Sequence, residues 1–120
     1  MSFNLTVRSE GDVSILDLEG RLVLGEGSGE LRNGIKSLLA AGNKKILINL
    51  SRVSYIDSSG LGELVSAYAS VSGAGGQIKL ENVQTKVLDL LQITKLNSVF
   101  ETFPDEGTAL KSFRAAAAGA

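Results

Sequence analysis

The 120-residue sequence has no cysteine, no histidine and no tryptophan, and it has a single proline. Without cysteine the chain forms no disulfide and has no thiolate nucleophile, and without histidine it lacks the commonest general base and transition-metal ligand. The H-E-x-x-H, G-x-S-x-G and G-x-x-x-x-G-K-[ST] motifs are also missing, and the acidic residues are scattered singly. We therefore expect a protein that is not an enzyme and holds no metal ion or other cofactor.

Long apolar runs and a surplus of charge of either sign are missing as well. No apolar stretch approaches the ~18 residues that a membrane-spanning helix needs, and residues 1–8 alternate in polarity instead of forming the apolar core of a signal peptide. The net charge of −1 argues against electrostatically driven binding to nucleic acid or to an anionic membrane. We expect a cytoplasmic protein that binds neither of them directly, a location that suits a chain without cysteine.

The most informative stretch runs over residues 45–68. It opens at residues 46–50 with a mostly apolar run rich in β-branched residues, which is typical of a strand buried on both faces. From Leu61 onward, apolar residues recur at the i, i+3, i+4, i+7 spacing of a helix that packs on a sheet. The connecting residues 57–60 have the side chains of a helix N-cap, and they follow a strand end, where α/β proteins place ligands and regulatory groups. They are either a plain helix cap or part of a functional site.

Patterns along the rest of the chain predict alternating strands and helices, with the second strand ending at Gly20 and a short extra extended piece at residues 21–24. The expected elements are strands at residues 3–8, 13–18, 46–50, 77–81 and 98–103, and helices at 28–42, at 61–72, from Thr85 and after Pro104. The predicted fold class is α/β, a mixed β-sheet with an initial antiparallel hairpin and then mainly parallel strands, covered by about four α-helices. We expect residues 1–114 to form one domain, followed by a low-complexity C-terminal tail at residues 115–120.

A glycine-rich loop at residues 25–29 precedes the first expected helix. Backbone N–H groups at such a helix start can bind a phosphate, so a weak nucleotide-binding protein is one alternative. The loop matches neither the phosphate-binding loop of nucleotide hydrolases nor the G-x-G-x-x-G dinucleotide motif. A mobile connection is the simpler interpretation.

The run I-N-L-S-R-V-S-Y-I-D-S-S-G-L-G at residues 48–62 resembles the central motif of STAS domains, above all that of the anti-sigma factor antagonists of bacteria. The resemblance extends from about Phe3 to Phe113 and implies a STAS-like fold. In that family the serine after the motif aspartate is phosphorylated by a kinase that is also the anti-sigma factor, and here that residue is Ser58. The resemblance therefore implies a binding module that sequesters an anti-sigma factor/serine kinase while Ser58 is unphosphorylated, and so positively regulates sigma-dependent transcription. A serine phosphatase would reverse the modification.

Around Ser58 the resemblance implies supporting roles for Asp57, Ser59 and Gly60. Physical reasoning alone does not choose between the two serines, because either hydroxyl suits a helix start. The family often carries an aspartate after G-x-L, where this chain has Val23. Contacts that such an acidic side chain would make to a kinase or a nucleotide are therefore not expected here.

A partner-binding surface is expected beside Ser58, on the loop at residues 25–29 and the outward face of the central helix. Small residues on that face, Ala67 and Ser70 among them, would allow close approach by another protein, and Glu63 would be its only charge. The residues expected on this surface are Gly25, Gly27, Leu61, Gly62, Glu63 and Ser66. The alternatives are an exposed helix face of no consequence, or a STAS module of another assembly, stressosome-like or transporter-associated.

Overall fold

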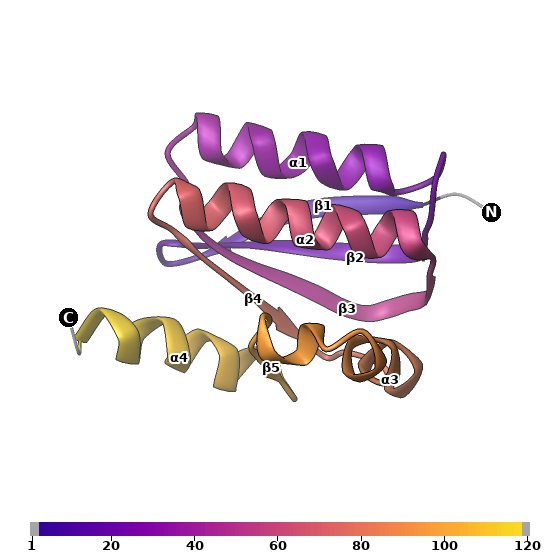
Figure 1. Ribbon diagram of the computed structural model, residues 1–120. Coiled ribbons are helices and arrows are strands. Elements are labelled where there is room, and N and C mark those ends of the chain that lie inside the picture. The colour runs from indigo at the N-terminus through magenta and orange to yellow at the C-terminus, as the bar shows by residue number, and fades with distance from the viewer. Residues whose placement is uncertain (1–2, 119–120) are drawn as a thin grey trace.

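The computed structural model describes residues 3–118 and contains a five-stranded sheet with four α-helices (Figure 1). The elements are β1 (Asn4–Glu10), β2 (Val13–Leu22), α1 (Ser28–Ala40), β3 (Lys45–Ile56), α2 (Ser58–Gly73), β4 (Gln77–Glu81), α3 (Thr85–Ile93), the 3₁₀ helix η1 (Leu96–Ser98), β5 (Thr102–Phe103) and α4 (Glu106–Ala118). The strands lie side by side in chain order; β1 and β2 are antiparallel, and all later neighbours are parallel. The predicted fold class is confirmed. None of the helices in this described part is long and apolar enough to cross a membrane.

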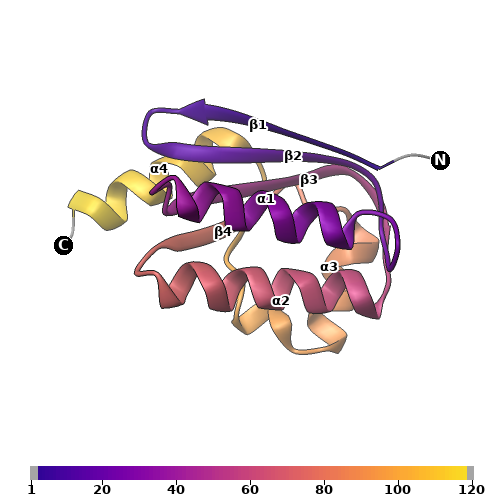
Figure 2. The same cartoon turned by 90° about the horizontal axis from the view of Figure 1, so that it is seen from above.

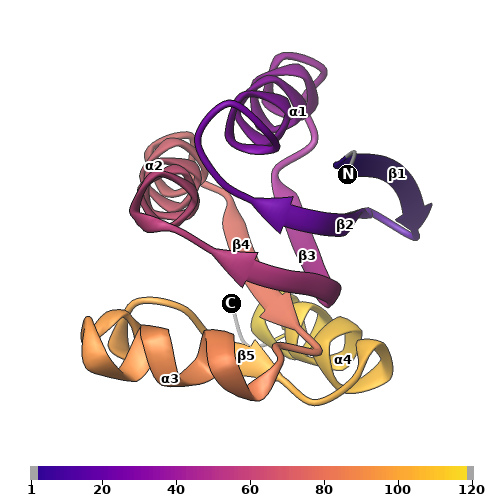
Figure 3. The same cartoon turned by 90° about the vertical axis from the view of Figure 1, so that its right-hand side faces the viewer.

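The strand order decides which face of the sheet each helix covers. Each parallel connection moves one strand further in the same direction, and right-handed crossovers then place α1, α2 and α3 on a common face. Seen from above, α1 and α2 lie side by side (Figure 2). After β5 the chain folds back, and α4 covers the opposite face (Figure 3). The carboxyl ends of the parallel strands therefore meet at one edge, beside the start of α2.

Two clusters of buried apolar residues follow from this arrangement. The larger lies between the sheet and helices α1, α2 and α3, and the smaller lies under α4. The smaller cluster consists of Val13, Ile15, Leu47, Ala109 and Phe113. Strand β3 contributes to both, since Ile46 and Ile48 belong to the larger cluster and Leu47 to the smaller, and all three are 0% exposed. The prediction of a strand buried on both faces at residues 46–50 is confirmed.

Strands β2 and β3 are longer than the sequence predicts. The expectation that β2 ends at Gly20 is wrong, because a bulge there lets the strand continue to Leu22. The first two residues of the extended piece expected at 21–24 are thus the end of β2. Gly20 has φ 114°, a conformation that side chains rarely allow, and the register with β3 shifts at this point. Strand β3 continues past residue 50 to Ile56, which pairs with Leu22. These extensions carry both strand ends to the start of α2.

The prediction of a strand at residues 98–103 is wrong for most of these residues. Residues 96–98 form the 3₁₀ helix η1, and the N–H groups of Val99 and Phe100 both donate to the carbonyl of Leu96. Phe100 turns into the larger core, where its ring meets that of Tyr68 edge to face at 5.6 Å. Adjacent Val99 and Phe100 both pack on that core, which the alternating directions of a strand do not allow. Only Thr102–Phe103 remain as β5.

The C-terminal helix begins two residues after Pro104 and is capped by Asp105. The Oδ1 atom of Asp105 accepts a hydrogen bond of 2.7 Å from the N–H of Thr108. The helix continues to Ala118, so the predicted tail at residues 115–120 begins inside α4. Residues 119–120 lie outside the described part of the chain.

Candidate functional site

Asp57 joins the end of β3 to the start of α2 and binds groups on both sides. Its Oδ1 accepts a hydrogen bond of 2.8 Å from the N–H of Gly60, and its Oδ2 accepts one of 3.1 Å from the N–H of Leu24. These donors, that of Gly60 first, hold the pKa of Asp57 below its usual range. The predicted helix cap is confirmed. The same carboxylate also fixes the loop between β2 and α1 beside it.

Substituting Asp57 tests this double role. We expect Asp57→Ala to lower the urea midpoint of unfolding, because it removes both acceptors, and Asp57→Asn to lower it less, because one amide oxygen still caps the helix. The pKa of the carboxyl is lowered on folding, so its contribution is present at neutral pH and is lost as pH falls through the folded pKa. Urea titrations at pH 7 followed by circular dichroism measure the midpoints. Equal midpoints for the two variants would contradict the cap at Gly60, and a midpoint of Asp57→Asn equal to that of the wild type would contradict the contact to Leu24.

The two serines after Asp57 differ in accessibility. Ser58 is the first residue of α2 and is exposed, whereas Ser59 is half-buried. The first N–H groups of a helix have no partner within the helix, so the oxygen atoms of a phosphate on Ser58 would meet free donors. Of the two hydroxyl groups, that of Ser58 is therefore the more accessible.

Gly60 lies where α2 touches the end of β2. A Cβ atom at this position would be 2.0 Å from the carbonyl oxygen of Leu22. The N–H of Asp57 donates to that same oxygen at 3.3 Å. Gly60 therefore supports the site sterically, by letting the helix start approach the strand.

The loop at residues 25–29 uses most of its N–H groups internally. Val23 and Glu26 exchange backbone hydrogen bonds of 2.9 and 3.1 Å, and the N–H of Ser28 donates to the carbonyl of Val23. The N–H of Gly27 donates to the carboxylate of Glu30 at 3.1 Å. A negative side chain thus occupies the start of α1, where a phosphate would have to bind. This arrangement argues against a nucleotide site in the loop.

The prediction that Glu63 and Ala67 lie on the outward face of α2 is wrong. They are 9% and 5% exposed, because α1 packs along that side of α2 (Figure 2). The Glu63 carboxylate binds the guanidinium of Arg32 on α1 through two contacts, Nε to Oε1 at 3.0 Å and Nη2 to Oε2 at 2.9 Å. Glu63 therefore links two helices and is not a free charge on the surface.

The exposed side of α2 is instead a stripe without any charged residue. We call it the α2 face; its members are Ser58, Gly62, Val65, Ser66, Ala69 and Ser70. Of the remaining residues predicted for a partner surface, Gly25 is exposed, Leu61 is partly buried, and Gly27 is buried against the ring of Phe3. The sequence interpretation missed Leu24, which is 75% exposed although the loop that carries it is fixed by Asp57. Its place in a run of apolar residues gave no signal of exposure.

Comparison with known proteins decides the family. Residues 4–109 match the family model described as STAS domain. The chain belongs to the STAS domain family. Over 63 residues this STAS domain is 38% identical to the protein of Bacillus subtilis (strain 168) named Anti-sigma-B factor antagonist, and the alignment covers 52% of the chain. The matched region spans 58% of the length of that relative.

Solved structures show the same fold over nearly the whole STAS domain. A crystal structure from Thermotoga maritima is 27% identical with a TM-score of 0.86, and the match covers 92% of this chain and 94% of that one. The phosphorylated form of the Bacillus cell fate determinant SpoIIAA is 20% identical with a TM-score of 0.73, covering 92% and 99% of the two chains. At that identity the likeness to SpoIIAA shows the fold alone. The predicted STAS-like fold is confirmed.

Proposed function

We propose that this STAS domain is an anti-sigma factor antagonist, a binding module switched by phosphorylation of Ser58. Unphosphorylated, it sequesters an anti-sigma factor that is also a serine kinase, and so frees a sigma factor for transcription. Phosphorylated by that kinase, it lets go, and a serine phosphatase resets it. The module works in the cytoplasm and is not itself an enzyme. The name of the Bacillus subtilis relative supports the role of anti-sigma factor antagonist, and the exposed position of Ser58 supports the phosphorylation switch.

The observation that carries the proposal is the exposed Ser58 at the head of the uncharged α2 face. Small, uncharged side chains let a partner approach the helix closely, and depletion of charge is typical of the centre of protein interfaces. A phosphate on Ser58 would bring a charge of about −1.5 to −2 to this surface. A partner shaped for a neutral hydroxyl would have to desolvate that charge, which weakens the complex.

The switch acts on the interface, and the fold stays intact. A phosphate at the start of α2 is stabilised by the helix dipole and by free N–H groups, by about 0.3–1 kcal/mol when exposed. The carboxylate of Asp57 next to it repels the phosphate and stays in place, because both of its oxygens accept hydrogen bonds. These opposing effects are of similar size and leave the stability of α2 nearly unchanged.

The proposal is tested by incubating the protein with candidate serine-kinase anti-sigma factors and ATP and mapping the phosphate by mass spectrometry. We expect one phosphate, on Ser58, in the wild type and in Ser59→Ala, and none in Ser58→Ala. Ser59→Ala is the matched control, because it removes the neighbouring hydroxyl and leaves the cap at Asp57 in place. Phosphate on Ser59, or no phosphate with any kinase, would contradict the proposal.

A further inference from the structure

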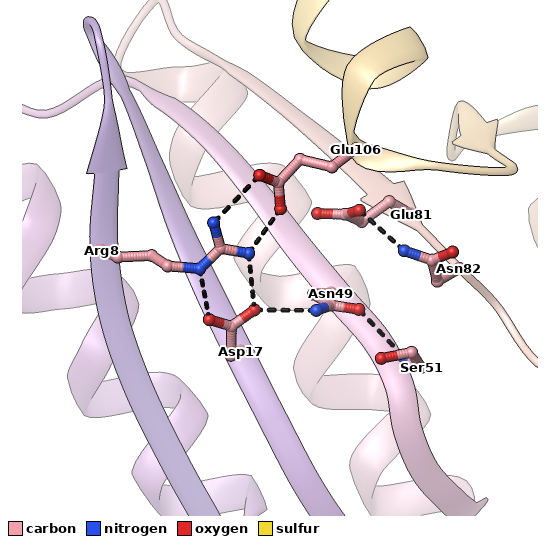
Figure 4. Close-up of polar contacts among 7 residues, drawn as sticks. All are labelled: Arg8, Asp17, Asn49, Ser51, Glu81, Asn82 and Glu106. Carbon is pink, nitrogen blue, oxygen red and sulfur yellow. Dashed lines mark hydrogen bonds and ion pairs between the residues drawn. The ribbon is translucent and has the colours of Figure 1, made fainter.

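Glu81, the last residue of β4, is an acidic side chain that is 0% exposed. Its Oε1 atom accepts a hydrogen bond of 2.8 Å from the side-chain amide of Asn82 (Figure 4). Its Oε2 atom has no hydrogen-bond donor among the described residues. A buried carboxylate oxygen without a donor is strongly disfavoured, whereas the same oxygen carrying a proton is itself a donor.

The charged groups around Glu81 come from four elements, and among residues 3–114, whose side chains the structure describes, none is a cation free to pair with it. Arg8 on β1 places its guanidinium between two other carboxylates, with Nε 2.6 Å from Asp17 on β2 and Nη1 3.0 Å from Glu106 on α4 (Figure 4). On β4 itself, Lys79 directs its ammonium to Ser112 at 2.8 Å and to Glu101 at 3.5 Å. Strand β3 contributes the neutral Asn49, which donates to Asp17, and β5 carries no charged residue.

We infer that Glu81 carries a proton in the folded protein and donates it to the carboxylate of Glu106, so that a protonated carboxyl holds the start of α4 on the sheet. The proton gives the otherwise unpartnered Oε2 a hydrogen bond. It also removes the repulsion between two adjacent carboxylates, one of which, Glu106, is already engaged by Arg8. Burial first, and then the charge of Glu106, raise the pKa of Glu81 to about 7.

Helix α4 is therefore a part of the fold whose attachment depends on pH near neutrality. The pKa of Glu81 is higher in the folded state than in the open state, so the attachment is stronger at mildly acid pH, where Asp17 and Glu106 are still ionised, and weakens as pH rises through 7. Because α4 rests on its own small apolar cluster, it can open without unfolding the larger core. The neighbours Asp17 and Glu106 have lowered pKa values, so they titrate at more acid pH than Glu81.

Two measurements test the inference. Carbon-detected NMR of the wild type should show the Glu81 carboxyl titrating near pH 7, not at the ordinary value of about 4.3. Amide exchange of α4, taken relative to that of α1 and corrected for intrinsic rates, should show the opening constant rising about tenfold between pH 6 and pH 8.

The variant Glu81→Gln keeps the shape of the protonated side chain, and its α4 opening constant should not change over this pH range. Glu19→Gln, at an exposed position on β2, is the matched control and should behave as the wild type does. A Glu81 titration at the ordinary pH would overturn the inference, as would the wild-type pH dependence persisting in Glu81→Gln. If Glu81→Gln does not fold, the wild-type titration decides alone.

Discussion

Ser58→Asp is expected to weaken binding to the cognate anti-sigma factor about 10²- to 10³-fold, whereas Ser58→Ala should bind within about threefold of the wild type. The reason is the negative charge placed at residue 58, the first residue of the otherwise uncharged α2 face. Desolvating this charge in the complex is expected to cost about 3–4 kcal/mol. Each 1.4 kcal/mol changes the dissociation constant tenfold. Asp has one negative charge where the phosphate has nearly two, so its effect should lie toward the lower end of the range.

Isothermal titration calorimetry with the purified anti-sigma factor gives these dissociation constants. Ser9→Asp, an exposed serine on β1, is the control that adds the same charge away from the α2 face, and it should bind as the wild type does. Thermal unfolding should give closely similar midpoints for wild type and Ser58→Asp, because the helix dipole favours an acidic side chain at this position. Unchanged affinity in Ser58→Asp, or an equal loss in Ser9→Asp, would refute the switch.

Hydrophobic patterning was enough to predict the order of elements and the mixed sheet. Residues 46–50 are apolar except for Asn49 and show no alternation, and so short a run bounded by polar residues favours a strand covered on both faces. The prediction failed where geometry depends on a neighbour in space. The bulge at Gly20 arises in the pairing of β2 with β3, and the turn of Phe100 into the core depends on Tyr68, 32 positions earlier in the chain. Neither partner is visible in the local pattern.

The candidate site divides in the same way. The cap at Asp57 involves an N–H only three residues away, so the local sequence was sufficient to predict it. Its second contact, to Leu24, and the pair between Glu63 and Arg32 join residues 33 and 31 positions apart. Helical periodicity fixed which side of α2 faces the sheet, but not that α1 would cover the adjoining side. The outward placement of Glu63 failed for this reason.

Gly60→Ala and Gly62→Ala, two residues apart near the start of α2, are expected to change stability in opposite directions. At Gly60 a Cβ atom would lie 2.0 Å from the oxygen of Leu22 and 2.8 Å from its carbonyl carbon, so the start of α2 must move away from β2. Overpacking of this kind costs about 3 kcal/mol. At Gly62 a Cβ atom would meet nothing within 4 Å, and alanine in a helix is favoured over glycine by about 0.8–1 kcal/mol.

Urea titrations followed by circular dichroism should therefore separate the two variants by about 4 kcal/mol in the free energy of unfolding. Equal stabilities would mean that the close approach of α2 to Leu22 does not exist in solution. The two variants also distinguish an effect on folding from an effect on binding, because Gly62 belongs to the α2 face and Gly60 is buried beneath it. Since Gly62→Ala makes the fold more stable, a loss of anti-sigma factor affinity in this variant would report direct contact of the partner with α2.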